Sequence, residues 1–464
     1  MRFSAAEVLR EVAGGADGPL PEVFPAVVTD SRSLPPGALF VALRGEQHDG
    51  HDFVPQALAG GAGAALVRAS YVSRAGAPLI RVEDPGRALL RLGLSARRRW
   101  AGPLVAITGS VGKTTTKDLL AHLLGGAPEV LAAEKSFNNA VGVPLTLLRL
   151  EPAHRVAVLE LGTNAPGEIR TLTEACEPDV GVITGIAEAH LEGLGDLDGV
   201  LEEKAELVRG LRPDGTAVLN VDDARLRRLA SELPGRVLWF GSRAGAAVRG
   251  TNARRVRGGI SFQLEGGPRV RLPMAGLHNA ANALAALAAA QALGRVPGPL
   301  AERCAGFAPP PLRMEERSVR GVHLIADLYN ANPRSMQAAL EELKTRRTGR
   351  RVLVAGDMKE LGRGAPTYHR EVGAAAATSG IDLICAVGPL ARYTAEGARA
   401  SGAPAERVLQ FETVEDAARE LPGRVAPGDT VMIKGSRVLR LERLAAAFEA
   451  PLPGSLKTSE VSDS

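Results

Sequence analysis

Short apolar runs alternate with amphipathic stretches over most of the chain from residue 104 onward. Four of these runs, LVAIT, VAVLEL, VGVIT and AVLN, are bounded by turn residues and separated by segments with helical periodicity. Short runs that are wholly apolar are typical of strands buried on both faces of a parallel sheet. We therefore expect a mostly parallel sheet with helices on both faces over residues 101–310.

The regions on either side have patterns of their own. Residues 1–100 mix short apolar runs (AVVTD, ALFVAL, AALV) with one expected helix at FVPQALAGG. After the linker signal GFAPPP, a second rhythm begins, in which VHLIADLY, VLVAGDM, LICAVG, VLQF and TVMIKG are each followed by a helical segment. The pattern predicts an α/β chain with a small α/β domain at 1–100, a central domain at 101–310 and a Rossmann-like α/β domain at 311–450.

Two further segments depart from the strand–helix rhythm. The stretch ARRVRGGISFQLEGGPRVRLP at 253–273 alternates in the manner of β-strands and precedes a long Ala-rich helix, NAANALAALAAAQALG. The final segment, 451–464, is polar, and we expect it to be disordered.

Composition and charge exclude several classes of protein. A net charge of +4 over 464 residues is too weak to indicate nucleic acid or an anionic membrane as a partner. The three cysteines are far apart and lack metal-ligand spacing, which favours a reducing compartment. The first 20 residues lack a signal-peptide pattern, and the longest apolar run, 280–292, is too short to span a bilayer. We expect a cytoplasmic protein without membrane insertion.

The stretch ITGSVGKTTTK at 107–117 resembles a phosphate-binding loop in a shortened frame. Such loops usually place four residues between the two glycines, whereas only two residues separate Gly109 from Gly112 here. An apolar strand precedes the loop and a helical segment follows it, so backbone amides at a helix N-terminus would face an anion. Lys113 would add a charge for the β/γ-phosphates and Thr114 a hydroxyl for Mg²⁺. The alternative is an ordinary glycine turn capped by threonine.

Other polar residues follow the next predicted strands. Glu160 ends VAVLEL and His190 lies just beyond VGVIT, so both should converge near the loop at the carboxyl edge of the sheet. Each also has a structural interpretation, as a helix-capping acid and as a structural histidine. Asn138 lies in an Asn-Asn pair that could form only a turn. Lys204 lies on an amphipathic helix, where its residue chemistry alone favours a solvated lysine paired with a neighbouring glutamate.

Taken together, the motifs resemble those of the Mur ligases. They are ITGSVGKTT, NNAVGVPLTLL, ELGTNAPGEI, AHLEGLG with EEKAELV, GLHNAANALAA, DLYNANPRSM, AGDMKELG and KGSR. The match runs in order from DSR at 30–32 to KGSR at 434–437, and the shortened loop is itself a mark of this superfamily, shared with folylpolyglutamate synthases. YNANPRSM at 329–336 and GDMKELG at 356–362 indicate the branch that adds D-alanyl-D-alanine. The Asp-Asn-Pro-Arg motif expected of the diaminopimelate-adding branch does not occur in the sequence.

The resemblance implies ATP and two Mg²⁺ as cofactors of a P-loop-type ATPase domain. The residues implied to contact the nucleotide are Gly109, Ser110, Val111, Gly112, Lys113, Thr114, Thr115, Asn138, Asn279, Asn282, Arg313, Asp327 and Asn330. One Mg²⁺ would be held by Thr114 and Glu160, and the second by His190 and a carbamylated Lys204. Lys113, Glu160, His190 and Lys204 would be the catalytic residues.

The resemblance also implies the substrates. UDP-N-acetylmuramoyl-tripeptide would bind the first domain, and D-alanyl-D-alanine would be the acceptor amine. The residues implied to contact substrate are Ser31, Arg32, Asp49, Gly50, His51 and Asn332. The tripeptide carboxylate would attack the γ-phosphate of ATP, and the amine would displace phosphate from the resulting acyl phosphate. We expect a monomer.

The chain departs from the family pattern at three places, and alternatives remain open. Ala326 stands where the family commonly has the first Asp of Asp-Asp-Ser, Leu312 replaces a glycine before Arg313, and VLRLE after KGSR lacks the usual Met. One alternative is a sister ligase that adds diaminopimelate or lysine, or a folylpolyglutamate synthase-like ligase. Another is a nucleotide-binding regulator that has lost catalysis, for which Ala326 is the only indication.

Overall fold

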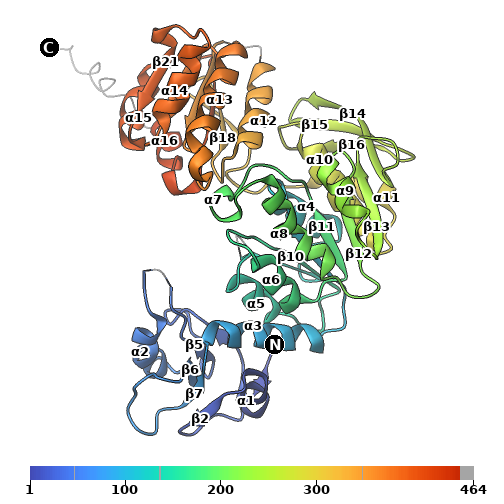
Figure 1. The fold of residues 1–464 in the computed structure, drawn as a ribbon, viewed down its shortest axis with the longest axis vertical. Coiled ribbons are helices and arrows are strands. Elements are labelled where there is room, and N and C mark those ends of the chain that lie inside the picture. Colours follow the sequence, from blue (N-terminus) through green and yellow to red (C-terminus); the bar gives the residue numbers. More distant parts are fainter. Residues whose placement is uncertain (46, 135–136, 347–348, 450–464) are drawn as a thin grey trace, which may run out of the picture. The chain divides into compact units, whose positions relative to one another are not determined.

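The structure is a computed structural model that describes residues 1–45, 47–134, 137–346 and 349–449. The tail that we expected to be disordered, 451–464, lies outside the described residues. Within them the chain forms two compact units (Figure 1). The first comprises Met1–Gly185, Leu201–Arg249 and Ala283–Ala301, and the second comprises Ile186–Val200, Gly250–Asn282 and the chain from Glu302 onward.

The N-terminal part of the first unit contains a small mixed sheet. Its strands, in spatial order, are β2 (Gly15–Asp17), β7 (Leu79–Val82), β6 (Ala64–Arg68), β5 (Leu39–Val41) and β4 (Val27–Val28). Only β2 is antiparallel to its neighbour. A separate antiparallel pair joins β1 (Phe3–Ser4) to β3 (Val23–Phe24). The three predicted apolar runs therefore do form strands.

The helices of this region are α1 (Ala5–Val12), α2 (Val54–Ala59) and α3 (Pro85–Arg99). The predicted helix at FVPQALAGG is present as α2, whereas α1 and α3 were not predicted. The missed α3 carried clear signals, because Asp84 caps its N-terminus, Pro85 occupies the first turn, and Leu89, Leu92 and Ala96 repeat at helical spacing on its buried face.

The rest of the first unit is built on a parallel sheet. Its strands, in spatial order, are β13 (Arg236–Gly241), β12 (Thr216–Asn220), β11 (Val180–Ile183), β8 (Leu104–Thr108), β10 (Val156–Glu160) and β9 (Val130–Ala132). The helices of this part are α4 (Lys113–Leu123), α5 (Gly142–Leu147), α6 (Glu168–Cys176), α8 (Leu197–Arg209) and α9 (Ala224–Ala230). Every residue of β8, β10 and β11 is buried, as their largely apolar sequences predict.

The order of these strands determines where a ligand can bind. β8 lies between β10 and β11, although it precedes both in sequence. The chain therefore passes from β8 to β9 and β10 on one side of it, and then crosses to β11 on the other side. In open α/β sheets, ligands bind outside the carboxyl ends of the strands at such a switch point. The loop after β8 is at this point.

The second unit contains a six-stranded sheet. Its strands, in spatial order, are β17 (Glu315–Val319), β18 (Val322–Asp327), β22 (Thr430–Lys434), β19 (Arg351–Gly356), β20 (Leu383–Val387) and β21 (Val408–Phe411). The helices that follow the five parallel strands are α12 (Pro333–Lys344), α13 (Ala365–Thr378), α14 (Ala391–Ala400), α15 (Val414–Glu420) and α16 (Glu442–Ala447). Each predicted strand and following helix is present, and β17 adds an unpredicted antiparallel edge.

The predicted β-rich insert forms antiparallel strands in the second unit. β14 (Val248–Val256) pairs with β15 (Gly259–Leu264), and β15 pairs with β16 (Arg269–Leu272). The long helix α10 (Asn279–Ala292) and α11 (Pro297–Arg303) follow.

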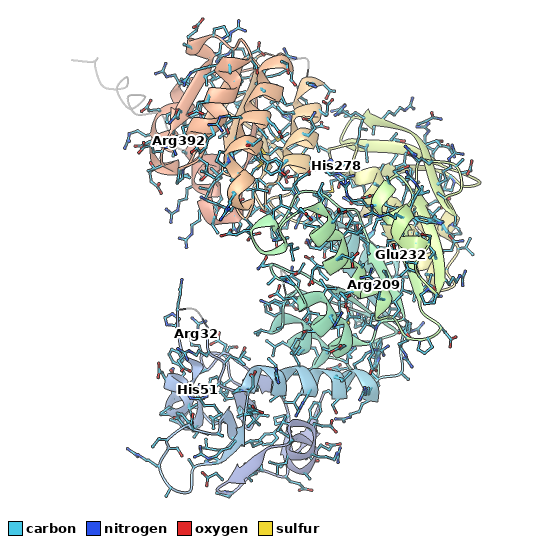
Figure 2. All side chains as sticks on the ribbon, in the orientation of Figure 1. Arg32, His51, Arg209, Glu232, His278 and Arg392 are labelled. Atoms are coloured by element: carbon cyan, nitrogen blue, oxygen red, sulfur yellow. The ribbon has the colours of Figure 1, made fainter. Side chains whose placement is uncertain are left out.

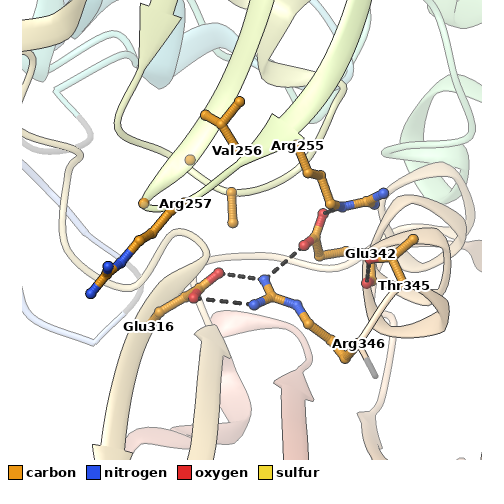
Figure 3. Close-up of a pocket in the computed structure, with 10 residues that line it drawn as sticks. Arg255, Val256, Arg257, Glu316, Glu342, Thr345 and Arg346 are labelled. Carbon is orange, nitrogen blue, oxygen red and sulfur yellow. Dashed lines mark hydrogen bonds and ion pairs between the residues drawn. The ribbon is translucent and has the colours of Figure 1, made fainter. Parts of the chain in front are cut away.

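An ion-pair network joins this insert to α12 and β17 beside a cavity of about 360 Å³ (Figure 3). Nε of Arg255 contacts Oε2 of Glu342 at 2.8 Å, and NH2 of Arg346 contacts Oε1 of the same carboxylate at 2.7 Å. Arg346 also pairs with Glu316. The side chain of Glu342 is only 1% exposed, so its charge depends on these two arginines.

Among the described helices, none is long and apolar enough to cross a membrane.

Candidate functional site

The loop between β8 and α4 has the backbone of a tight anion-binding turn. Gly109 and Gly112 adopt φ values of 145° and 84°, which glycine tolerates and other residues rarely adopt. A Cβ at Gly109 would lie 2.0 Å from Oγ1 of Thr184, at the end of β11. The amide of Ser110 donates to the carbonyl of Gly185 at 3.0 Å. Both glycines are therefore required by the geometry, and the adjacent strand braces the loop.

Lys113 and Thr114 form the first turn of α4. Nζ of Lys113 donates to the carbonyl of Gly109 at 2.8 Å, so the ammonium group folds back over the loop. Oγ1 of Thr114 donates to Oε2 of Glu160 at 2.6 Å. The carboxylate is 2% exposed, and its other oxygen accepts from Nδ2 of Asn138 at 2.9 Å. The structure thus brings together Thr114, Asn138 and Glu160, three residues from different motifs of the sequence.

The meeting of Thr114 and Glu160 follows from strand register. Glu160 is the last residue of β10 and is paired with Ile107 of β8, two residues before the loop begins. The carboxylate therefore leaves the sheet beside the start of α4. A hydroxyl and a carboxylate held together are hard oxygen donors of the kind that Mg²⁺ prefers. Among the described residues, no group of three or more His, Cys, Asp or Glu side chains could hold a metal ion, so any cation here would also need other oxygen ligands.

Lys204 is buried, contrary to the expectation from residue chemistry alone. It lies on α8 and is 1% exposed, which excludes a solvated lysine. Burial, together with the positive charge of Lys113, lowers the pKa of Lys204 to about 7, and the carboxylate of Glu203 opposes part of this shift. Because the charge of Lys113 acts on its pKa, Lys204 lies near the loop between β8 and α4.

The neighbouring glutamates have structural roles of their own. Glu203 is 5% exposed and accepts hydrogen bonds from the amides of Gly167 and Ile169, both at 2.7 Å, at the start of α6. It therefore caps that helix and does not point to solvent. Glu206 accepts from Nε of Arg170 at 2.6 Å. Both carboxylates are engaged away from Lys204.

His190 belongs to the second unit, so its predicted convergence with Glu160 and Lys204 remains a prediction. The residue has a φ of 57° and immediately precedes the short helix α7 (Leu191–Leu194). Its Nδ1 lies 2.6 Å from Oε2 of Glu360, in the loop after β19.

Asn279 and Asn282 are buried at the beginning of α10. Nδ2 of Asn279 donates to the carbonyl of Ala275 at 2.6 Å, and its Oδ1 accepts from Nδ2 of Asn282 at 2.8 Å. The pair is therefore internally ordered. Its predicted role at the nucleotide remains a prediction.

The third-domain residues gather at the carboxyl ends of β18 and β22. Asp327 and Lys434 are register partners, and Nζ of Lys434 donates to Oδ2 of Asp327 at 2.6 Å. The same ammonium donates to the carbonyl of Asn330 at 2.9 Å. Asn332 caps α12 by accepting from the amide of Ser335.

The backbone before Arg313 shows why the family commonly has glycine where this chain has Leu312. The guanidinium of Arg313 lies 4.0 Å from the ring centroid of Tyr329, a cation–π geometry. Leu312 has a φ of 63°, in the left-handed region that favours glycine. Glycine, which is common in the family at this position, would adopt this backbone conformation without strain. Leu312 adopts it at a cost in conformational free energy.

Ala326 lies in the hydrophobic core of the third domain. Its side chain is 1% exposed and packs in the hydrophobic core of the third domain with Leu324 and Ile433. Successive side chains of a strand point to opposite faces, so Asp327 lies on the other face.

The residues predicted to bind substrate in the first domain lie on two loops (Arg32 and His51 are labelled in Figure 2). Both ring nitrogens of His51 are engaged, since Nδ1 lies 2.6 Å from Oδ1 of Asp49 and Nε2 accepts from the amide of Arg68. These two contacts of the imidazole hold the loop around His51 in place. A Cβ at Gly50 would lie 2.5 Å from the carbonyl oxygen of Leu43.

Ser31 and Arg32 lie in a polar turn. The Arg32 guanidinium binds both oxygens of Asp30 at 2.8–2.9 Å and holds the pKa of that carboxyl at about 2. The contacts of Ser31, Arg32, Asp49, Gly50 and His51 with a ligand remain predictions.

The sequence analysis missed two charged residues beside the predicted ones. Lys434 and Glu360 lie in the quoted motifs KGSR and GDMKELG, but neither received a role. The scarcity of lysine in the chain and the position of Lys434 at a strand end were available signals. Nothing local to Glu360 indicates its contact with His190, which is 170 residues away.

The comparisons with known proteins agree with this geometry. Residues 24–96 match the model of the Mur ligase family catalytic domain, 107–290 the Mur ligase middle domain, and 312–437 the Mur ligase glutamate ligase domain.

Relatives in sequence cover almost the whole chain. It is 37% identical over 436 residues to the UDP-N-acetylmuramoyl-tripeptide–D-alanyl-D-alanine ligase of Escherichia coli (strain K12), covering 91% of this chain and 93% of that protein. The enzyme of the same name from Bacillus subtilis (strain 168) is 34% identical, with coverage of 93% and 94%.

Solved structures give the same result. A crystal structure of MurF from Acinetobacter baumannii superposes with a TM-score of 0.89 at 33% identity, covering 97% of this chain and 99% of that one. MurF ligase from Thermotoga maritima, in complex with ADP, superposes with a TM-score of 0.81 at 29% identity, covering 91% and 97%. Because the three domain models match in order and relatives at 34–37% identity cover 91–93% of it, the chain belongs to the Mur ligase family.

Proposed function

We propose that this chain is the ATP-dependent ligase that adds D-alanyl-D-alanine to UDP-N-acetylmuramoyl-tripeptide through an acyl phosphate, in cytoplasmic peptidoglycan precursor synthesis. The observation that carries the proposal is the arrangement of Lys113, Thr114 and Glu160 at the switch point of the sheet. It occurs in a chain whose relatives at 32–38% identity all have the name of this ligase.

The loop residues would bind the phosphates of ATP. The amides at the start of α4 point toward the loop, and the helix dipole favours an anion there. Lys113 would exchange its carbonyl partner, Gly109, for the β/γ-phosphates. Ser110, Val111 and Thr115 complete the loop and the first helical turn. Asn138 would hold Glu160 in place while the nucleotide binds.

The donor set of Thr114 and Glu160 fits one Mg²⁺, and His190 and Lys204 would hold a second. Bound Mg²⁺ neutralises charge where the substrate carboxylate approaches the triphosphate. Glu160 is buried and fixed at both oxygens, so it is preorganised to accept a cation in place of the Thr114 hydrogen. Lys113 contributes a fixed positive charge on the same side of the reaction.

Lys204 would act as a carbamate. Its neutral amine attacks CO₂, a C–N bond forms, and the nitrogen loses a proton. Burial supports this step, because it holds the pKa of Lys204 at about 7 and so keeps much of the amine neutral. A protonated lysine would repel a cation, whereas a carbamate supplies anionic oxygen donors.

The third domain would close over the nucleotide and the acceptor. The chain would have three domains, at 1–100, 101–310 and 311–450. Asp327, with Lys434 and Asn330, forms a fixed polar cluster at its ligand edge. Asn279, Asn282 and Arg313 would face the nucleotide, and Asn332 the acceptor. Closure would exclude water and protect the acyl phosphate from hydrolysis.

The remaining assignments concern the donor substrate and the state of the enzyme. Ser31, Arg32, Asp49, Gly50 and His51 would contact the uridine nucleotide, and the contacts of His51 with Asp49 and Arg68 would hold its loop in place. The enzyme would work as a monomer in the cytoplasm.

The mass of the product tests this proposal. Incubation of the purified chain with ATP, Mg²⁺, UDP-N-acetylmuramoyl-tripeptide and D-alanyl-D-alanine should yield the UDP-linked pentapeptide and one phosphate per product. An unchanged tripeptide in the presence of all four components would contradict it.

A further inference from the structure

The β-rich insert concentrates positive charge in a short part of the chain. Residues 249–272 contain six arginines and one acidic residue, Glu265. This excess of five positive charges is larger than the net charge of +4 of the whole chain, so the rest of the chain taken together is slightly acidic. The weak net charge therefore conceals a strongly basic segment.

Strand register places three of these arginines on one face of the insert. Ser261 of β15 is paired with Arg254 of β14 on one side and with Arg271 of β16 on the other. Paired residues of neighbouring strands point to the same face, and so do residues two apart in one strand, which adds Arg269. We call Arg254, Arg269 and Arg271 the basic face. The opposite face is buried, and its side chains include Ile260, Phe262, Val270 and Leu272.

The neighbouring Arg255 shows the contrast between the two faces. It points away from the basic face and pairs with the buried carboxylate of Glu342 at 2.8 Å. That arginine therefore has a structural role within the second unit. The arginines of the basic face have no such role.

The three arginines of the basic face are exposed and lack acidic partners. In the part of the chain that the structure describes, none of them pairs with a carboxylate, and Arg269 donates only to the hydroxyl of Ser261, at 3.3 Å. Their Cα atoms are about 7 Å apart along β16 and about 10 Å apart across the sheet. Like charges held at this spacing repel one another. The arrangement favours an anionic partner from outside the chain.

The other side chains of the insert indicate which kind of anion fits. Arginine binds a phosphate through two parallel N–H groups. Among the described residues of the insert, no large apolar side chain is exposed, so the apolar anchors typical of protein interfaces are missing. The aromatic residue of the insert, Phe262, is fully buried, so the basic face offers no ring for stacking with single-stranded nucleic acid. Phosphate groups arranged in a plane remain as the matching partner.

We propose that the basic face binds the phosphate headgroups of an anionic membrane surface. Arginines close to such a surface are attracted to it, and the attraction falls off within a Debye length. No described helix is able to cross a bilayer, so the contact is peripheral and reversible. This binding site goes beyond the proposed ligase function and does not depend on it.

The competing interpretation is protection of a sheet edge. β16 is the edge strand of its sheet, and charged side chains on an edge strand hinder pairing with another chain. Under that interpretation the protein does not bind vesicles, and loss of the arginines leads to self-association. The two interpretations therefore predict opposite results with the wild type alone.

The first measurement is co-sedimentation of the full-length protein with lipid vesicles at low ionic strength. The wild type should bind vesicles of phosphatidylcholine with one-third phosphatidylglycerol, stay in solution with phosphatidylcholine alone, and leave the anionic vesicles when salt is added. Absence of binding to the anionic vesicles would overturn the proposal.

The second measurement compares two triple variants with the same change in net charge. The variant Arg254→Gln, Arg269→Gln, Arg271→Gln should lower partitioning onto anionic vesicles on the order of 100-fold. The control variant Arg236→Gln, Arg295→Gln, Arg407→Gln changes three exposed arginines outside the insert and should bind as the wild type does. Equal losses in both variants would show an effect of net charge and refute the site. Thermal melting and ligase turnover in solution should be unchanged in both.

A competition with duplex DNA separates lipid from nucleic acid as the source of phosphate. DNA at a phosphate concentration equal to that of the phosphatidylglycerol should leave most of the wild type on the vesicles. Transfer of the protein from the vesicles to the DNA, abolished in the variant of the basic face, would identify nucleic acid as the partner and overturn the membrane assignment.

Discussion

The hydroxyl of Thr114 donates to the carboxylate of Glu160 at 2.6 Å, joining the first turn of α4 to the end of the neighbouring strand β10. The contact is buried and depends on the strand order, which places β10 next to β8. It puts an anionic oxygen donor beside the helix N-terminus that would bind phosphates.

Lys113→Ala should abolish turnover while the protein stays folded. The ammonium group covers the loop and would stabilise charge that develops on the transferred phosphoryl group. Losing such a contact should cost about 3–4 kcal/mol, or on the order of 10²–10³ in kcat. Phosphate release measures the loss, and circular dichroism checks the fold. Near-normal kcat would show that the loop is not catalytic.

Lys204→Ala should abolish ligation while ATP affinity stays largely intact. The variant removes the carbamate but none of the phosphate loop, and added acetate or formate should partly restore turnover by supplying a carboxylate. In wild type the neutral amine should rise from about a tenth at pH 6 to about nine-tenths at pH 8, given a pKa of about 7. Carbamylation should therefore increase over that range.

A crystal structure near pH 8 with Mg²⁺ and nucleotide tests the same assignment. Electron density for a carbamate on Nζ of Lys204 is the expected result. A bare ammonium group in that crystal would rule out the modification.

Asn330→Ala should weaken turnover and leave binding of the UDP-tripeptide unchanged. Asn330 lies at the ligand edge of the third domain, where its carbonyl accepts from Lys434, whereas the uridine nucleotide would bind the first domain. Isothermal titration calorimetry with the UDP-tripeptide gives the affinity directly. A large loss of that affinity would refute the separation of roles between the two domains.

Arg346→Ala should destabilise the protein by about 1–3 kcal/mol, because it leaves the buried Glu342 with Arg255 as its remaining arginine partner. Arg370→Ala is the matched control, since it breaks an exposed pair with Glu396 and should change stability by less than about 1 kcal/mol. Urea unfolding of both variants measures the difference. Equal midpoints would show that the network beside the cavity contributes little.

Local patterns predicted the strand–loop–helix frame of the site well. The buried strand before Gly109, the glycines of the loop and the acid at the end of VAVLEL are all signals within a few residues. Their meeting in space followed from a general property of parallel sheets, whose carboxyl ends share an edge. The contact between Thr114 and Glu160 could therefore be predicted from the sequence.

The environment of Lys204 was not predictable in the same way. A lysine beside two glutamates on an amphipathic helix favours a solvated side chain, and only the packing of α8 shows that Lys204 is buried. Glu203 is turned away because α6 begins where its carboxylate can cap the helix. The contact of Glu360 with His190 joins two loops far apart in sequence, and no local pattern encodes it.

The most direct test of the central claim is an acceptor screen at fixed ATP, Mg²⁺ and UDP-tripeptide. Phosphate release is measured with D-alanyl-D-alanine, diaminopimelate, L-lysine or L-glutamate as the amine, and Lys113→Ala sets the background. The account predicts release above background with D-alanyl-D-alanine alone. Release with diaminopimelate, lysine or glutamate in its place would identify a different ligase, and background release with every amine would contradict catalysis itself.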